Sequence, residues 1–203
     1  MAPHPLGDAV NDFEAGDGPP EPESRFLLAA GLLVHGAMVV AALSWLWLRE
    51  RLDVLPERSI GEQGPLLGSF CGLGVGVAGA FSMAQASSRL RSLREVEAVA
   101  QRVFAGAGDM ALVAFVTFGA VAEELFFRLA VQDLLGLAGS VATCIVVNST
   151  VAGWAWLPIA AMHALLLGLL VQQGFGLLGS TTANAVMNYF HLRRILCSAS
   201  MCR

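Results

Sequence analysis

The feature that most constrains this chain is a run of 23 apolar residues from Phe26 to Leu48, with no charged side chain inside it. A helix of that length can cross the ~30 Å hydrocarbon core of a membrane. Backbone N–H and C=O groups find no water at that depth, so helices and closed barrels are the structures that span. Trp45 and Trp47 lie at the end of the run, where indole rings anchor to the membrane surface. We therefore expect an integral membrane protein.

Further apolar segments follow the first, and together they predict an all-α, polytopic membrane helix bundle. Only 14% of the residues are charged, against about 25% in soluble domains. We expect about six transmembrane helices and a surface amphipathic helix over 87–105, where apolar residues recur at helical spacing beside arginines. The six spans are expected at about 26–48, 65–86, 110–135, 141–156, 158–172 and 177–190, with a polar loop over 49–64 and a turn over 136–140.

Small residues recur every four positions along the second expected span, and they predict close contact with another helix. This contact could lie within the chain or between two copies of it, and the pattern does not distinguish the two. The small residues are Gly68, Gly72, Gly76, Ala80 and Ala84.

The chain is expected to have two tails around the membrane region. Residues 1–24 are acidic and rich in proline, which predicts disorder, and 196–203 are expected to be a short C-terminal tail. Residues 25–86 hold the first two expected membrane helices, and 87–195 hold the rest of the membrane core. The twelve basic residues form no basic domain, so we expect membrane lipid as a partner and no nucleic acid.

The arginines are distributed unevenly between the two sides of the predicted bundle. Six spans place eight on the side of the termini and three on the other, so both termini are expected in the cytoplasm. The expected location is the bacterial inner (plasma) membrane. The eight are Arg25, Arg89, Arg91, Arg94, Arg102, Arg193, Arg194 and Arg203, and the three are Arg49, Arg51 and Arg58.

Two adjacent carboxylates and an arginine interrupt the third expected span. Ionisable groups at membrane depth cost about 2.5–3.5 kcal/mol each on insertion scales and usually mark function. Glu124 and Arg128 are four residues apart on a helix and can form an ion pair. The Glu123 side chain is rotated by about 100° from that of Glu124 around the helix axis, so it can point into a cavity. A free carboxylate there can take a proton from water. A purely structural ion pair between helices is an equal alternative.

A second polar row runs along the sixth expected span. Two asparagine amides on one helix face can donate hydrogen bonds to a developing oxyanion, or can simply bond a neighbouring helix. His163 in the fifth span could assist a carboxylate or be a packed core histidine, and His35 in the first span is expected to pack against a neighbour. The row comprises Ser180, Asn184, Asn188 and His191.

The sequence contains no G-x-S-x-G, HExxH or P-loop motif, and its four cysteines form no zinc pattern. We therefore predict neither a cofactor nor a metal site, and a serine or zinc hydrolase of those types is poorly supported.

The stretch from Glu123 to Arg128 resembles the EExxxR motif of the CPBP family, which comprises CAAX prenyl endopeptidases and bacteriocin-processing or immunity-type membrane proteins. The similarity extends over about 87–195. It implies an all-helical intramembrane glutamate protease acting on a membrane-associated peptide or protein. In that scheme Glu123 activates water, Glu124 and Arg128 orient it, and Asn188 matches the oxyanion-binding asparagine of the family's HxxxN motif.

Two positions depart from the family pattern. Asn184 stands where HxxxN has its histidine, and Trp156 falls where the FxxxH motif has its own, seven residues before His163. Two hypotheses follow: an endopeptidase in which Asn184 and His163 replace the missing groups, or a catalytically silent relative that binds a membrane peptide for immunity or regulation. A transport or channel subunit is a third, which no visible inverted repeat supports. His163 beside Glu123 would favour the enzyme, and Trp156 in that place would favour the silent relative.

Overall fold

The structure is a computed structural model that describes residues 22–104, 107–152 and 156–200. These residues are helical, with no strand among them, so the all-α prediction is confirmed. Three segments are long and apolar enough to cross a membrane, namely 25–48, 65–89 and 109–149. The membrane class is thereby supported, and the number of six crossings stays a prediction. The acidic, proline-rich tail expected over 1–24 lies almost wholly outside the described residues.

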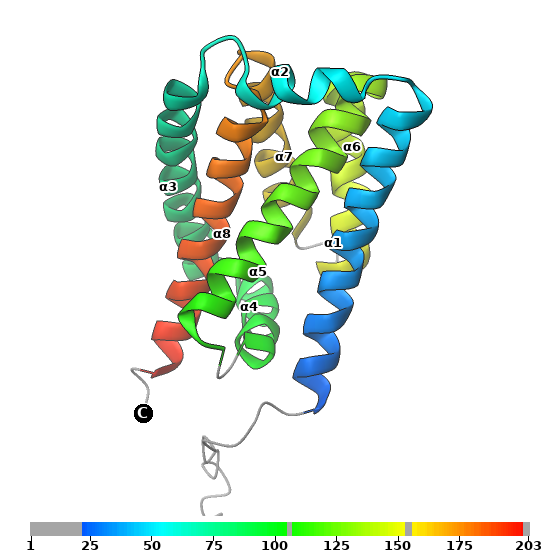
Figure 1. The fold of residues 1–203 in the computed structure, drawn as a ribbon. Helices are drawn as coiled ribbons and strands as arrows, with labels where there is room; N and C mark the ends of the chain where they lie inside the picture. The colour runs from blue at the N-terminus through cyan, green and yellow to red at the C-terminus, as the bar shows by residue number, and fades with distance from the viewer. Residues whose placement is uncertain (1–21, 105–106, 153–155, 201–203) are drawn as a thin grey trace, which may run out of the picture.

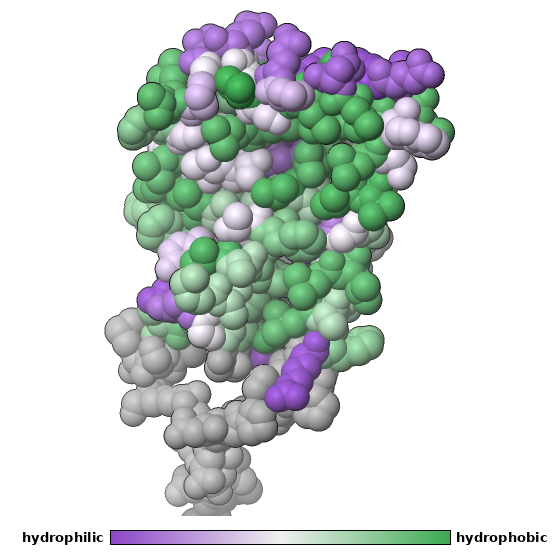
Figure 2. All heavy atoms as spheres, viewed as in Figure 1, coloured by the Kyte–Doolittle hydropathy of each residue, from purple (hydrophilic) through white to green (hydrophobic). Residues whose placement is uncertain are grey.

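The long helices run side by side in one bundle, with a shorter helix near each end (Figure 1). α2 covers one end, while α4 lies at the other, where α1 begins and α8 finishes. Figure 2 shows apolar side chains along the visible side of the bundle and hydrophilic ones gathered at the α2 end, as a membrane-embedded bundle requires. The elements are α1 (Pro22–Leu48), η1 (Leu52–Val54), α2 (Leu55–Ile60), α3 (Pro65–Arg89), α4 (Arg91–Phe104), α5 (Asp109–Glu124), the π-helix η2 (Leu125–Val131), α6 (Gln132–Ala152), α7 (Leu157–Gln172) and α8 (Gly176–Ser200).

The glycine stripe of α3 packs against α8 within the same chain. Gly68, Gly72 and Gly76 are buried, and a Cβ on Gly72 would overlap the carbonyl oxygen of Gly179. A Cβ on Gly76 would lie 2.8 Å from the carbonyl oxygen of Ala183. The absence of side chains thus lets the two backbones touch. The stripe therefore serves an internal contact, which was one of the two possibilities.

Several boundaries differ from those expected. α3 continues to Arg89, and an extended Leu90 separates it from α4, so the amphipathic helix begins later than expected. α8 continues to Ser200 because the apolar pattern persists beyond the last span, with Ile195 buried, so most of the expected tail is helical. The polar loop over 49–64 contains η1 and α2. The expected turn reduces to Gly136, whose φ of 69° glycine adopts without strain.

Ion pairs connect neighbouring elements at both ends of the bundle. At the α2 end, Arg51 and Arg58 donate to the Asp133 carboxylate at 2.7 and 3.1 Å. At the other end, Glu97 of α4 pairs with Arg194 of α8, and the Nε2 atom of His191 lies 3.6 Å from Oε1 of Glu97. α4 is therefore fixed to the last turns of α8.

α1 is the least enclosed of the long helices. Only 6% of its most apolar stretch is buried within the bundle. Ala42 and Leu46 face inward, whereas Leu33 and Trp47 are 74% and 67% exposed. Most of the apolar surface of α1 is therefore not covered by the rest of the bundle.

Candidate functional site

The carboxylate pair lies where α5 changes into the π-helix η2. Glu124 ends α5, and Arg128 lies one turn on inside η2. The Nε atom of Arg128 is 3.4 Å from Oε2 of Glu124, and both side chains are 2% exposed, so the expected ion pair is confirmed. π-helical turns are rare and often occur at functional sites. No sequence signal was used to predict this one.

Arg128 is held on its other side by a serine of α6. Its Nη1 atom donates to Oγ of Ser140 at 2.8 Å, and that hydroxyl donates to the carbonyl oxygen of Phe127 at the same distance. Ser140 is fully buried. The guanidinium is therefore fixed in place, and its charge is directed at Glu124.

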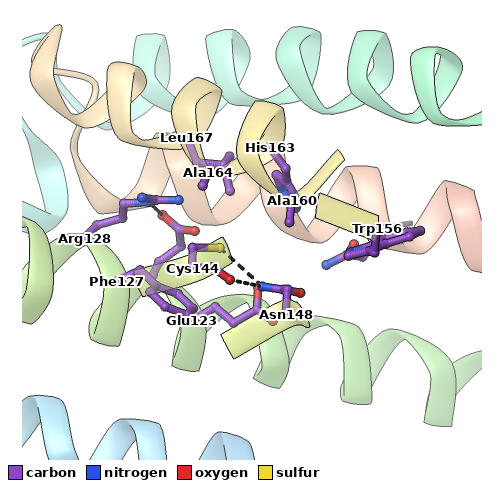
Figure 3. Close-up of a pocket in the computed structure, with 12 residues that line it drawn as sticks. Glu123, Phe127, Arg128, Cys144, Asn148, Trp156, Ala160, His163, Ala164 and Leu167 are labelled. Atoms are coloured by element: carbon purple, nitrogen blue, oxygen red, sulfur yellow. Dashed lines mark hydrogen bonds and ion pairs between the residues drawn. The ribbon is translucent and has the colours of Figure 1, made fainter. Parts of the chain in front are cut away.

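Glu123 and Glu124 both line a cavity of about 80 Å³, but the Glu123 side chain is one third exposed whereas that of Glu124 is 2% exposed. The cavity also receives Asn148, His163 and Asn188 from α6, α7 and α8. Figure 3 shows Glu123, Asn148 and His163 around this space, which we name the polar cavity. Glu123 thus lines a cavity as predicted, but Glu124 and its partner Arg128 line the same cavity, and the two glutamates differ in exposure instead.

Asn184 joins the two carboxylates from α8. Its Nδ2 atom donates to Oε2 of Glu123 at 3.0 Å and to Oε1 of Glu124 at 3.2 Å, and the residue is fully buried. Both hydrogens of that amide are therefore engaged, so Asn184 positions the carboxylates and is not free to hold an oxyanion. Asn188 donates to Oδ1 of Asn184 at 2.8 Å and also lines the polar cavity.

His35 of α1 is the site residue that the sequence analysis missed. Its Nε2 atom lies 3.6 Å from Oε1 of Glu123. Gly119 makes room for the ring, because a Cβ there would lie 3.2 Å from the Cε1 and Nε2 atoms of His35. Phe115 and Phe118 pack edge-on against the imidazole, with ring centroids 5.8 and 6.3 Å away. The available signal was a histidine at membrane depth, which is costly enough to suggest function.

His163 and Trp156 both line the polar cavity. The sequence analysis contrasted a site with His163 beside Glu123 and a site with Trp156 in that place, and the structure combines the two residues. The buried Nε2 atom of His163 has no hydrogen-bond partner among the described residues. Trp156 lies to one side of the cavity (Figure 3). Its ring is tilted by 47° against the His191 ring, and the two ring centroids are 6.3 Å apart. The site thus contains an available imidazole as well as the indole that replaces the expected one.

A second cavity of about 190 Å³ adjoins the polar cavity and shares Glu123, Trp156 and Asn188 with it. Across the part of the chain that is described, no group of three or more His, Cys, Asp or Glu side chains is arranged to hold a metal ion. Comparison of the chain with protein-family models, curated proteins and solved structures finds no match in any of the three. Any functional conclusion must therefore come from the chemistry of the two cavities.

Proposed function

We propose that the protein is an intramembrane endopeptidase of the CAAX-protease-like type, in which Glu123 activates water to cleave a peptide bond near the membrane surface. The observation that supports this most is the division of roles between the two carboxylates. Both line the polar cavity with an amide and an imidazole, but Glu124 is 2% exposed and paired with Arg128, whereas Glu123 is one third exposed and has no arginine partner within the described residues. A structural ion pair alone would need only one of the two glutamates.

The polar cavity has space for the reacting groups. A buried water needs roughly 10–15 Å³ of such space, and the cavity measures about 80 Å³. In the proposed reaction, the Glu123 carboxylate takes a proton from water as the oxygen attacks the carbonyl carbon of the substrate. The tetrahedral intermediate then collapses, the C–N bond breaks, and Glu123 returns the proton to the leaving nitrogen.

Two asparagines have separate roles in this proposal. Asn184 donates to Oε2 of Glu123, so the attacking water would bond Oε1, which lies 3.6 Å from Nε2 of His35. Asn188 lines the cavity and supplies an amide N–H for the developing oxyanion, provided that its bond to Asn184 rearranges when substrate binds. The unpartnered Nε2 atom of His163 can bond the attacking water or the substrate.

A catalytically silent, peptide-binding protein is the second candidate, and two observations favour it. Trp156 occupies part of the wall where the family pattern has a histidine, and the Asn184 amide is already saturated by the carboxylates. In that case the same cavity would bind a membrane peptide for immunity or regulation without cleaving it.

Cleavage of a library of membrane peptides by protein in lipid nanodiscs separates the two candidates. We expect the wild type to cleave, Glu123→Gln to lose cleavage, and the exposed Glu57→Gln on α2 to match the wild type. Equal cleavage by Glu123→Gln would exclude Glu123 as the base. Binding without cleavage by the wild type across the library would support the silent protein.

A further inference from the structure

The second cavity, which we name the chamber, extends from the carboxylates towards the α4 end of the bundle. Its walls come from α1, α3, α4, α5 and α8, and most of its lining is apolar. Its polar residues are His35 and Glu123 at one end, Asn188, and His191 near the last turns of α8. At about 190 Å³, it is more than twice the size of the polar cavity.

Two imidazoles on the chamber wall each have an unpaired nitrogen. The Nδ1 atoms of His35 and His191 are buried and have no hydrogen-bond partner within the described ranges. His191 is only 8% exposed, so bulk solvent does not reach it freely. A buried polar atom without a partner costs about 1–3 kcal/mol, and such atoms are rare in folded proteins. Each of the two nitrogens therefore needs a hydrogen-bond partner, and both rings line the chamber.

We propose that the chamber holds ordered water that links Glu123 to the α4 surface. Water can bond both Nδ1 atoms, the Glu123 carboxylate and the Asn188 amide, and a buried water usually makes 2–4 such bonds. An apolar side chain or a lipid chain would fill the volume and leave both nitrogens unsatisfied. Beyond His191, the polar contacts continue through Glu97 to Arg194, whose side chain is 36% exposed.

Ordered water in the chamber would supply the proposed hydrolysis at Glu123 with its reactant. Hydrolysis consumes one water for each bond cleaved, and the hydrocarbon core around the bundle holds almost none. The use of the chamber as a water source rests on the proposed function. Its hydration does not, because that follows from the two imidazoles and the volume alone.

Hydroxyl-radical labelling by X-ray radiolysis tests the hydration directly, because radicals form from nearby water and oxidise methionine sulfur. The chain offers a matched pair: Met83 and Met187 belong to one apolar cluster and are 2% and 1% exposed. Met83 lines the chamber, whereas Met187 lies outside its lining. For wild-type protein in nanodiscs, we expect mass spectrometry to show Met83 oxidised several-fold faster than Met187. Equal rates would overturn the proposal.

A variant in which a larger side chain fills the chamber provides a second test of its hydration. Val116 lies on the chamber wall and is buried, so Val116→Phe should displace the water and bring the Met83 rate down to that of Met187. Val113→Phe, on an exposed position of the same helix, should leave both rates unchanged. An undiminished Met83 rate in a folded Val116→Phe protein would also overturn the proposal.

The outcomes separate this proposal from the protease proposal. Slow oxidation of Met83 in a protein that cleaves peptides would refute the hydrated chamber and leave the protease standing. Fast oxidation of Met83 in a protein that cleaves no peptide of the library would support the chamber and favour the silent protein over the protease.

Discussion

At the scale of single residues, two neighbouring glutamates of identical chemistry have different surroundings. Glu124 is paired with a guanidinium and lines only the polar cavity, while Glu123 lines both cavities and lies beside a histidine from another helix. The 100° step of a helix separates the two side chains, and the packing of α1 and α8 completes the difference. The pair therefore combines a structural carboxylate with one that is available for chemistry.

Removing the cation from this pair should be costly. Arg128→Met leaves the buried Glu124 carboxylate without its partner, and breaking a buried ion pair costs about 3–5 kcal/mol. The exposed pair between Arg58 and Asp133 is the control, where Arg58→Met should cost at most about 1 kcal/mol. Denaturant titration in detergent, followed by circular dichroism, measures both. Similar losses for the two variants would contradict the buried pair, and the double variant Arg128→Met/Glu124→Leu should recover part of the loss.

The imidazole of His35 gives a second prediction at this scale. If it assists Glu123, His35→Gln should lower kcat by about 10²–10⁴, the usual contribution of a positioned acid–base group. Gly119→Ala should lower kcat in the same direction because its Cβ would press on the ring at 3.2 Å. Gly36→Ala, next to His35 but with nothing within 4 Å of the new Cβ, is the matched control. An unchanged kcat in His35→Gln, with a loss in His163→Gln, would assign the role to His163.

At the scale of elements, the contact between α3 and α8 depends on glycines that bring two backbones together. This contact positions Asn184 and Asn188, because both lie on α8 within two to three turns of the glycine contact. A disturbance of the contact should therefore reach the site.

Two glycines on α3 make this testable. Gly72→Ala would place a Cβ against the Gly179 carbonyl oxygen, so we expect a marked loss of thermal stability. Gly74→Ala meets nothing within 4 Å and should be neutral, or stabilising by up to about 1 kcal/mol through helix propensity. Thermal unfolding in detergent compares the two. A loss that is equal in both variants would show that the α3–α8 contact does not require the glycine.

The same scale shows what the sequence could and could not predict. Apolar runs located the helices, and the spacing of Glu124 and Arg128 predicted a contact within one turn. The bond from Asn184 to Glu123 joins residues 61 positions apart, and it depends on how α8 packs beside α5. The contact of His35 with Glu123 likewise requires α1 to lie against α5, which no local period encodes. Hence the ion pair of Glu124 and Arg128 was predictable from local spacing, whereas the contacts of Asn184 and His35 with Glu123 were not.

At the scale of the whole molecule, the two ends of the bundle carry unequal positive charge. Arg89, Arg94, Arg102, Arg193 and Arg194 lie at the α4 end, while Arg49, Arg51 and Arg58 lie at the α2 end. The first turn of α1 and the last of α8 share the α4 end (Figure 1). By the positive-inside rule, we propose that the α4 end faces the cytoplasm.

Single cysteines in a cysteine-free background check this orientation. Glu57→Cys lies on α2 and Ser88→Cys at the end of α3, and both positions are exposed. In intact cells, a membrane-impermeant maleimide should label Glu57→Cys and spare Ser88→Cys, because only the former would face outward. Lysed cells should label both and serve as the control. The reverse pattern in intact cells would place the termini outside.

The weak enclosure of α1 has a mechanical consequence. This helix carries His35 to Glu123, yet only 6% of its most apolar stretch is buried within the bundle. Its tilt is therefore set in part by the thickness of the bilayer, since helices tilt or shift to match the hydrocarbon around them. The separation of imidazole and carboxylate then becomes a function of the membrane, so lipids of different chain length would act on the site without binding to it.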